Sequence, residues 1–230
     1  MKKPELTILM PCLNEERTLG LCIDEAKTFI GRNDLSAEIV IADNGSTDRS
    51  CEIARGKGAR VVHVREKGYG NALKGGIAAA EGTYIIMGDC DMSYDFLNLE
   101  PMLALLRQGN DFVIGDRFKG GIESGAMPFL HKLGVPFLSF VGRIAFRTDI
   151  GDFHCGIRGF RTDAVRALEL TSGGMEFATE MIAKVTCAKL SVAQLPVPLR
   201  PDGRDGKPHL RTFRDGFRHL FLIFKLAFEK

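Results

Sequence analysis

The sequence predicts an α/β fold in a single domain, in which a mostly parallel sheet is flanked by helices. In the first half of the chain, five short apolar runs rich in branched side chains alternate with helical stretches. Such alternation is typical of βαβ units, which set parallel strands side by side with helices on both faces. With 230 residues, 45% of them hydrophobic, the chain is long enough to bury the core of this fold.

Each apolar run is a predicted strand, and polar residues follow it. The runs cover residues 6–10, 39–42, 61–64, 84–87 and 112–114. In open parallel sheets, ligands bind at the carboxyl ends of the strands. We therefore expect the polar segments after four of the runs to converge on one crevice. These segments are residues 11–16, 43–48, 88–91 and 115–117.

Composition argues against several classes of protein. The chain has 31 Lys and Arg against 29 Asp and Glu, so its net charge of +2 gives no reason to expect nucleic-acid binding. The six cysteines are scattered without a C-x-x-C pair, which favours neither a zinc site nor a disulfide framework and fits a reducing cytoplasm. The first apolar run is too short for a signal peptide, and no stretch reaches the roughly 20 apolar residues that span a bilayer.

The pair Asp89 and Asp91 is the sharpest chemical signal. Two carboxylates two residues apart at the end of a buried strand repel each other unless a cation lies between them. Their hard oxygen ligands suit Mg²⁺ or Mn²⁺, and such an ion would bridge a diphosphate. The alternative is that both side chains only cap the next helix. The carboxylates at the other strand ends favour the metal site.

Two further loops carry candidate nucleotide ligands. Asp43 follows the second predicted strand, where an acidic side chain can accept hydrogen bonds from a nucleoside. Lys67 begins a glycine-containing loop, residues 67–72, ahead of a predicted helix. That loop lacks the G-x-G-x-x-G spacing, and the sequence contains no G-x-x-x-x-G-K-[ST] motif. A dinucleotide enzyme and a P-loop NTPase are therefore disfavoured.

Taken together, the motifs resemble a known family. The segments ILMPCLNEE (residues 8–16), VIADNGSTD (40–48) and GDCD (88–91) are similar to the nucleotide-binding half of family 2 glycosyltransferases, which have the GT-A fold and act with inversion. Within that family, the chain most resembles polyprenyl-phosphate sugar synthases such as dolichyl-phosphate mannose and glucose synthases. The segments GDRFKGG (115–121), DFHCGIRGFR (152–161) and EFATEM (176–181) carry that likeness.

The resemblance implies which residues bind the donor. Pro11, Leu13 and Glu15 would hold the base, and Asp43 would hold the nucleoside. Lys67 is expected to contact the nucleotide as well.

The resemblance also assigns the metal and the diphosphate to Asp89 and Asp91, and the chain departs from the pattern in two places. The lipid-phosphate synthases usually carry Gln two residues beyond the second Asp, as a further metal ligand, where this chain has Ser93. They also tend to have an R-x-x-G-x-S motif later in the chain, whereas residues 204–209 here have proline in place of the serine. Arg204 and Lys207 of this loop are still expected to clasp the diphosphate.

Three side chains are candidates for the acceptor side of the reaction. By the resemblance, Arg117 would face a phosphate-bearing acceptor. Such an acceptor is already anionic and needs little general-base help, whereas a sugar hydroxyl needs a carboxylate within hydrogen-bond reach. Asp152 or Glu180 would supply that carboxylate. Together with Asp91 at the metal, these residues make up the predicted catalytic set.

The last stretch, residues 210–230, has the period of an amphipathic helix. Its aromatic face holds Phe213, Phe217, Leu220, Phe224 and Phe228, and a neighbouring basic face holds Arg211, Arg214, Arg218 and Lys225. Such a helix indicates a segment that lies in the membrane interface, and the alternative is a helix packed on the sheet with a solvated Arg stripe. Residues 128–147, also apolar and basic, are expected to form a second surface-seeking helix.

These observations divide the chain into residues 1–121, which would bind a nucleotide sugar, residues 122–209 on the acceptor side, and the helix at 210–230. The predicted activity is inverting transfer of a hexose from a UDP- or GDP-sugar to a polyprenyl phosphate of the dolichyl or undecaprenyl type, with Mg²⁺ or Mn²⁺. The protein would lie at the cytoplasmic face of the membrane, as a peripheral protein or as the soluble part of a longer membrane protein. The alternatives are transfer to a saccharide or glycan hydroxyl and a non-catalytic nucleotide-sugar-binding module.

Overall fold

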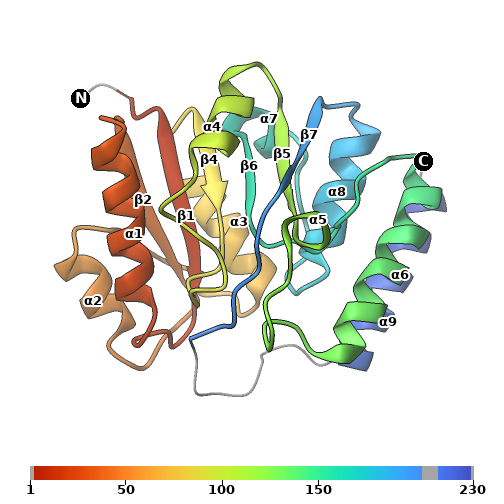
Figure 1. Ribbon diagram of the computed structural model, residues 1–230, viewed down its shortest axis with the longest axis horizontal. Coiled ribbons are helices and arrows are strands. Elements are labelled where there is room, and N and C mark those ends of the chain that lie inside the picture. Colours follow the sequence, from red (N-terminus) through yellow and green to blue (C-terminus); the bar gives the residue numbers. More distant parts are fainter. Residues whose placement is uncertain (1–2, 204–211, 229–230) are drawn as a thin grey trace.

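A seven-stranded sheet forms the centre of the structure (Figure 1). The computed structural model describes residues 3–203 and 212–228, with the backbone alone for residues 212–215. In sheet order β3-β2-β1-β4-β6-β5-β7, β6 runs antiparallel to its two neighbours and the other pairs are parallel, so the predicted, mostly parallel sheet is confirmed. The strands are β1 (Leu6–Cys12), β2 (Ala37–Asp43), β3 (Arg60–His63), β4 (Tyr84–Met87), β5 (Phe112–Asp116), β6 (Arg158–Arg161) and β7 (Val192–Pro196).

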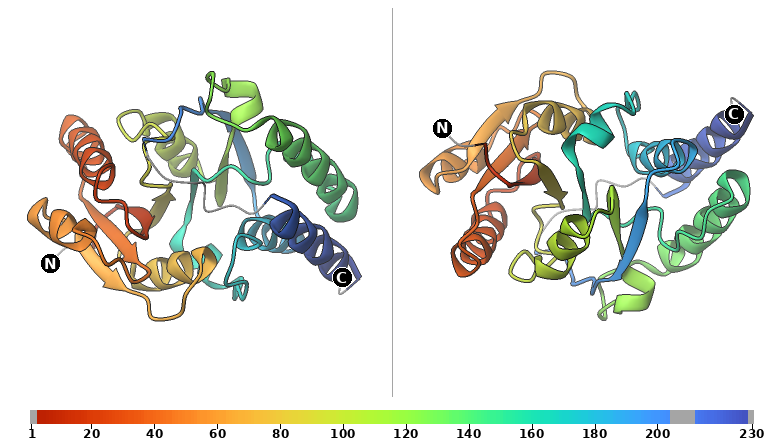
Figure 2. Two further views of the ribbon diagram at one scale, coloured as in Figure 1. Left: turned by 90° about the horizontal axis from the view of Figure 1, so that it is seen from below. Right: turned by 90° about the horizontal axis from the view of Figure 1, so that it is seen from above.

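Helices cover both faces of the sheet, as predicted. Figure 2 shows α1 (Leu19–Arg32) and α4 (Glu100–Arg107) on one face, and α3 (Tyr69–Ala79), α7 (Thr162–Arg166) and α8 (Phe177–Cys187) on the other. The short helix α2 (Ser50–Gly56) packs beside α1, and α5 (Arg117–Gly120) is a turn directly after β5. At the end of the molecule opposite α2, α6 (Phe129–Phe146) and α9 (Thr212–Phe228) lie side by side.

Strand pairing aligns the ends from which the predicted site emerges. Cys12 at the end of β1 lies opposite Asp43 of β2, and Asp43 lies opposite His63 of β3. On the other side of β1, Leu9 pairs with Met87, the last residue of β4. The polar residues after these strands therefore leave the sheet at the same end.

The apolar runs did not predict β6, although it lies in the middle of the sheet. Its Phe160 is fully buried and stacks on Phe112 of β5 at a ring centroid distance of 6.1 Å. Gly159 lets α4 approach, because a Cβ atom there would lie 2.9 Å from Met102 Cγ. Since β6 belongs to residues 122–209 and inserts between β4 and β5 of residues 1–121, the two predicted halves share one sheet.

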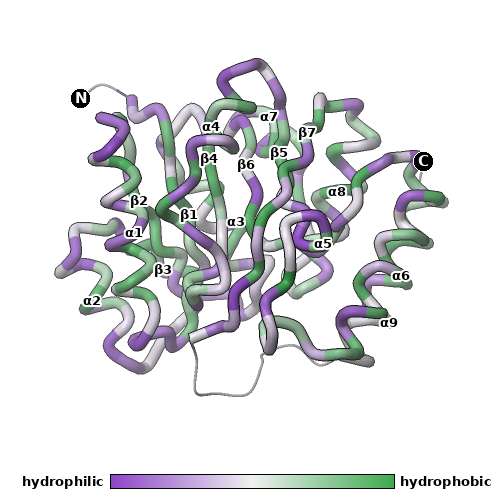
Figure 3. Tube along the Cα trace, in the orientation of Figure 1, coloured by the Kyte–Doolittle hydropathy of each residue, from purple (hydrophilic) through white to green (hydrophobic). Residues whose placement is uncertain are grey.

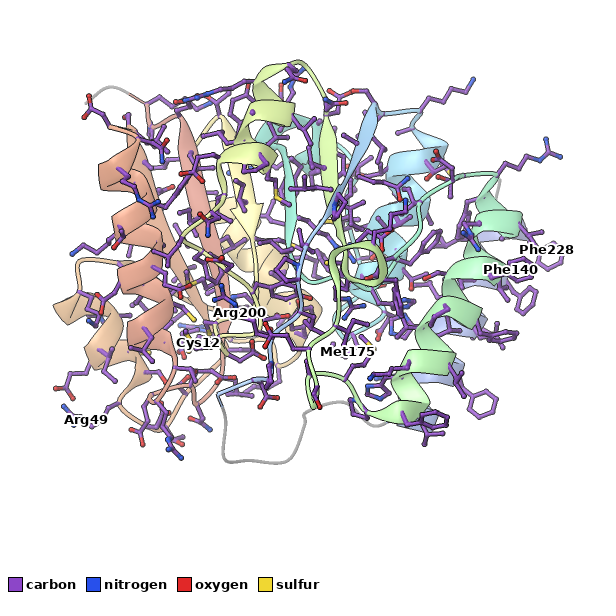
Figure 4. The ribbon with its side chains drawn as sticks, viewed as in Figure 1. Cys12, Arg49, Phe140, Met175, Arg200 and Phe228 are labelled. Atoms are coloured by element: carbon purple, nitrogen blue, oxygen red, sulfur yellow. The ribbon has the colours of Figure 1, made fainter. Side chains whose placement is uncertain are left out.

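The helices expected within residues 128–147 and 210–230 are present as α6 and α9, and together they expose a large apolar surface. Figure 3 shows hydrophobic residues along α6, and in Figure 4 Phe140 and Phe228 point away from the sheet. By length and composition alone, α6 could cross a membrane, and 17% of it is buried. The exposed residues of this α6–α9 surface are Phe129, Leu130, Leu133, Phe137, Phe140 and Ile144 on α6, with Phe217, Phe221, Phe224 and Phe228 on α9.

Candidate functional site

The strand ends line a cavity of about 530 Å³, called here the polar cavity. The prediction that these strand ends converge on one crevice is therefore confirmed. Arg204 and Lys207, also predicted at the diphosphate, lie outside the described residues. The predicted donor-site residues on the wall are Pro11, Leu13, Glu15, Lys67, Asp89 and Asp91.

Asp43, predicted to hold the nucleoside, is not among the described residues that line the polar cavity, whereas the adjacent Asn44 is, and the role of Asp43 stays a prediction. The Asp43 carboxylate accepts hydrogen bonds from the backbone N–H groups of Gly45 and Ser46 at 3.2 and 3.0 Å, and His63 Nδ1 lies 2.9 Å away. Burial opposes its charge, but the hydrogen bonds from Ser46 hold the pKa of Asp43 at about 2. Asp43 thus shapes the loop after β2.

Asn44 joins that loop to the loop after β3. Its Nδ2 donates to the carbonyl oxygen of Glu66, and its Oδ1 accepts from the Gly68 N–H, both at 2.7 Å. Lys67 Nζ donates to the Asn44 carbonyl oxygen, also at 2.7 Å. These bonds set the place of Lys67 on the wall. No local pattern predicts these bonds, because the partners lie 22 to 24 residues apart.

Asp89 and Asp91 both line the polar cavity, and neighbouring groups orient their carboxylates. The Tyr69 hydroxyl donates to Asp89 Oδ1 at 2.9 Å. The Ser93 backbone N–H and hydroxyl donate to Asp91 Oδ1 at 3.0 and 2.5 Å, so Ser93 supports a carboxylate at the position where Gln was expected. Two oriented carboxylates on a polar wall are hard oxygen ligands, and they fit a divalent cation such as Mg²⁺ or Mn²⁺.

A second cavity of about 520 Å³, the apolar cavity, lies between α6, α8 and α9. Apolar side chains of all three helices line it, among them Leu138, Phe177 and Leu220. Phe137 and Phe217 belong both to its wall and to the α6–α9 surface, so the cavity reaches the outside between these helices. The two cavities meet at the residues that line both: Tyr69, Asp89, Tyr94, Arg117, Met127, His131 and Met175.

Arg117 lies at this junction, and its guanidinium is bound to Asp152. Its Nε and Nη2 donate to the two Asp152 oxygens at 2.6 and 2.9 Å, and both side chains are buried. Asp152 also accepts from the His154 backbone N–H at 3.1 Å, and it is absent from the described walls of both cavities. The arrangement does not support Asp152 as a general base. Its carboxylate instead holds Arg117 at the wall.

Glu180 is likewise absent from the described walls. Its carboxylate accepts from the backbone N–H groups of Thr171 and Ser172 at 2.9 and 2.7 Å, and Lys184 Nζ lies 3.0 Å away. Burial opposes its charge, but the hydrogen bonds from Thr171 and Ser172 hold the pKa of Glu180 at about 2. Glu180 therefore fixes the loop of residues 171–174, and this geometry does not support it as a base either.

Histidines on the apolar cavity were not predicted as functional. His154 and His219 of α9 line it, and their rings meet edge to face at 4.6 Å. The Thr179 hydroxyl of α8 lies 2.7 Å from His219 Nδ1, so His219 ties α9 to α8. Burial, and next the neighbouring His219, keep the pKa of His154 well below its usual value. Spacing could have placed His219 on the inner side of the helix, because it lies two residues from the exposed Phe217 and Phe221.

Comparison with known proteins gives a family match over most of the chain: residues 7–169 match Glycosyl transferase family 2. A low-salt glycan biosynthesis hexosyltransferase of Haloferax volcanii is 38% identical over 94% of this chain, which spans 52% of that protein. A dolichyl-phosphate hexose transferase of the same organism is 30% identical over 98% of this chain and 95% of its own length.

Solved structures share the fold. Glucosyl-3-phosphoglycerate synthase from Mycobacterium tuberculosis, in complex with Mn²⁺, uridine diphosphate and glucosyl-3-phosphoglycerate, has a TM-score of 0.77 at 20% identity. The match covers 97% of this chain and 80% of that one. A structure of that synthase with Mg²⁺ and uridine diphosphate gives 0.76 at 18% identity, over 97% and 79% of the two chains.

Proposed function

Because this chain belongs to glycosyl transferase family 2, we propose that it transfers a hexose from a UDP- or GDP-sugar to a polyprenyl phosphate. The motif likeness to polyprenyl-phosphate sugar synthases agrees with the name of the dolichyl-phosphate hexose transferase that matches nearly the whole chain. The single observation that carries the proposal is the meeting of a polar and an apolar cavity at Asp89 and Arg117. A nucleotide sugar suits the first cavity, and a lipid chain suits the second.

In the polar cavity, this chain's own residues would bind and orient the donor. Pro11 and Leu13 offer an apolar wall for the base, and Lys67 offers a cation beside the phosphates. Asp89 and Asp91 would hold the divalent cation, which supplies charge stabilisation to the departing diphosphate when bound. Tyr69 and Ser93 keep these two carboxylates in place.

Where the two cavities meet, Arg117 would orient the acceptor phosphate. An oxygen of that phosphate attacks the anomeric carbon from the face opposite the diphosphate, and the bond to the β-phosphate oxygen breaks. The nucleoside diphosphate leaves with the electron pair, so the anomeric configuration inverts. An anionic phosphate needs no proton removed. This fits a site in which Asp152 and Glu180, the two carboxylates expected to act as a base for a hydroxyl acceptor, are engaged elsewhere.

The α6–α9 surface supports a location at a membrane. Its aromatic and aliphatic side chains would bury apolar area in the headgroup and acyl boundary, as interfacial helices do. Lys132 and Lys225 are exposed on the same two helices, where each would gain about 1 kcal/mol near anionic lipid. Arg218, part of the predicted basic face of α9, lines the polar cavity, so we do not count it among the side chains that would contact lipid headgroups. We infer that the protein docks by this surface at the cytoplasmic face and takes its acceptor from the bilayer between α6 and α9.

A transfer assay tests the proposal. Labelled UDP-glucose and GDP-mannose are each incubated with the protein, Mn²⁺ and either a polyprenyl phosphate in detergent or an oligosaccharide. The expected result is label in the lipid fraction with at least one donor, and none without a divalent cation. Label on the oligosaccharide alone would favour the rival acceptor, a glycan hydroxyl. Donor binding without transfer to either acceptor would favour the rival binding module.

A further inference from the structure

Tyr69, the first residue of α3, stands where the two cavities meet and touches a predicted metal ligand. We propose that Tyr69 is a positioning residue that sets the Asp89 carboxylate for the divalent cation, and that the loop of residues 171–174 fixes Tyr69 in turn. The inference rests on the proposed function, because it concerns the cation that Asp89 and Asp91 would share.

The Asp89 carboxylate is confined on two sides. On one side, the Tyr69 hydroxyl donates to Oδ1 at 2.9 Å. On the other side, Oδ2 faces the backbone at Gly156, where a Cβ atom would lie 2.5 Å from that oxygen. The Gly156 N–H donates to the Tyr94 hydroxyl at 2.8 Å, which holds this backbone in place. The Tyr69 hydroxyl and the Gly156 backbone therefore both restrict the position of the Asp89 carboxylate.

The Tyr69 phenol is the donor in this pair, because an ionised carboxylate can only accept hydrogen bonds. Groups that orient a metal-binding carboxylate in this way typically change metal affinity or activity by roughly 10–100-fold when they are removed.

Two glycines allow the start of α3 to pack closely against the loop of residues 171–174. A Cβ atom at Gly68 would lie 2.2 Å from the Gly173 carbonyl oxygen, and one at Gly70 would lie 2.4 Å from the Ser172 carbonyl oxygen. Either approach is open only to glycine. Tyr69 lies between these two contacts, so the position of the loop decides the position of its side chain.

Glu180 and Lys74 hold the loop from two helices. Glu180 of α8 accepts from the backbone N–H groups of Thr171 and Ser172, and Lys74 of α3 donates to the Thr171 carbonyl oxygen at 2.8 Å. The order of support therefore runs from Glu180 through the loop and Tyr69 to Asp89. Glu180 was expected from the sequence to act as a base, and we assign it here to positioning the loop of residues 171–174.

Tyr69→Phe tests the first step, because it removes the hydroxyl and keeps the ring. Mn²⁺ is titrated by calorimetry into the protein saturated with UDP, and in parallel with GDP. We expect Mn²⁺ affinity to fall roughly 10–100-fold. Nucleotide binding measured in EDTA and the melting temperature should stay at wild-type values. Tyr84→Phe is the matched control, since Tyr84 is half-buried on β4 and absent from the described walls of both cavities.

The outcomes separate this inference from the function on which it rests. If the wild-type protein fails to bind Mn²⁺ in the presence of UDP and also in the presence of GDP, both the proposed function and this inference are overturned. Wild-type binding with an unchanged Mn²⁺ affinity in Tyr69→Phe would overturn the inference alone. For the second step, Glu180→Gln should also weaken Mn²⁺ binding, and Tyr69→Phe should weaken it little further in that background. Fully additive losses would overturn the role of the loop.

Discussion

The substitution Glu180→Gln tests whether this carboxylate stabilises the fold or acts as a general base in the reaction. Its pKa is about 2 in the folded protein against an ordinary value of 4.5. At about 1.4 kcal/mol for each pH unit, that difference stabilises the folded state by about 3 kcal/mol at neutral pH. Gln keeps the shape and loses the charge, so the melting temperature at pH 7 should fall by roughly 6–12 °C for a chain of this size.

The pH dependence of the free energy of unfolding is a more specific test of this role. Since the folded-state pKa is lowered, the stabilisation is present above pH 4.5 and is lost as the pH falls towards 2. Urea unfolding of wild type and Glu180→Gln should therefore differ most at pH 7, by less than half as much at pH 3, and converge only as the pH approaches 2. Glu123→Gln, at an exposed position, is the control and should change little. A Glu180→Gln protein with wild-type stability and no transfer activity would refute the structural role and restore the catalytic one.

Three further changes probe the site. Asp91→Asn should abolish Mn²⁺-dependent nucleotide binding in calorimetry without lowering the melting temperature, and retained binding would remove Asp91 from the metal site. Arg117→Ala should cost about 3–5 kcal/mol of stability by leaving Asp152 buried without its cation, whereas Arg117→Gln with Asp152→Asn should fold and still fail to use a phosphate acceptor. Phe221→Ser with Phe228→Ser should weaken sedimentation with anionic vesicles and leave nucleotide binding intact, because these side chains are 72% and 88% exposed. Undiminished sedimentation would contradict docking by the α6–α9 surface.

The first five strands were predictable because each carries a short apolar run, which is mostly buried in β1, β2, β4 and β5 and partly buried in the edge strand β3. β6 was not, because its Arg158 looks like a surface residue in the sequence. In the structure Arg158 is buried, and its guanidinium donates to the backbone carbonyl oxygens of Phe153, Cys155 and Ala178 at 2.7 to 3.0 Å. Such partners come from tertiary structure and leave no local pattern.

The difference between local patterns and tertiary contacts also explains which residues of the site could be predicted. Residues at or just beyond the end of a strand, such as Pro11 of β1 and Asp89 after β4, reach the polar cavity because strand ends converge by topology. Asp43, at the end of β2, accepts hydrogen bonds from the backbone of the loop that follows, and these bonds could not be read from the sequence. Asp152 was expected to be a base because the sequence does not show that Arg117, 35 residues earlier, occupies it.

We propose that donor and acceptor meet at Asp89 and Arg117, and a crystal structure with both ligands bound would show whether they do. The protein would be crystallised with Mn²⁺, the nucleoside diphosphate that binds, and a short-chain polyprenyl phosphate. We expect the diphosphate beside Asp89 and Asp91, the lipid phosphate at Arg117, and the lipid chain between α6 and α9. A lipid phosphate bound away from Arg117, or a chain that leaves the apolar cavity empty, would contradict it.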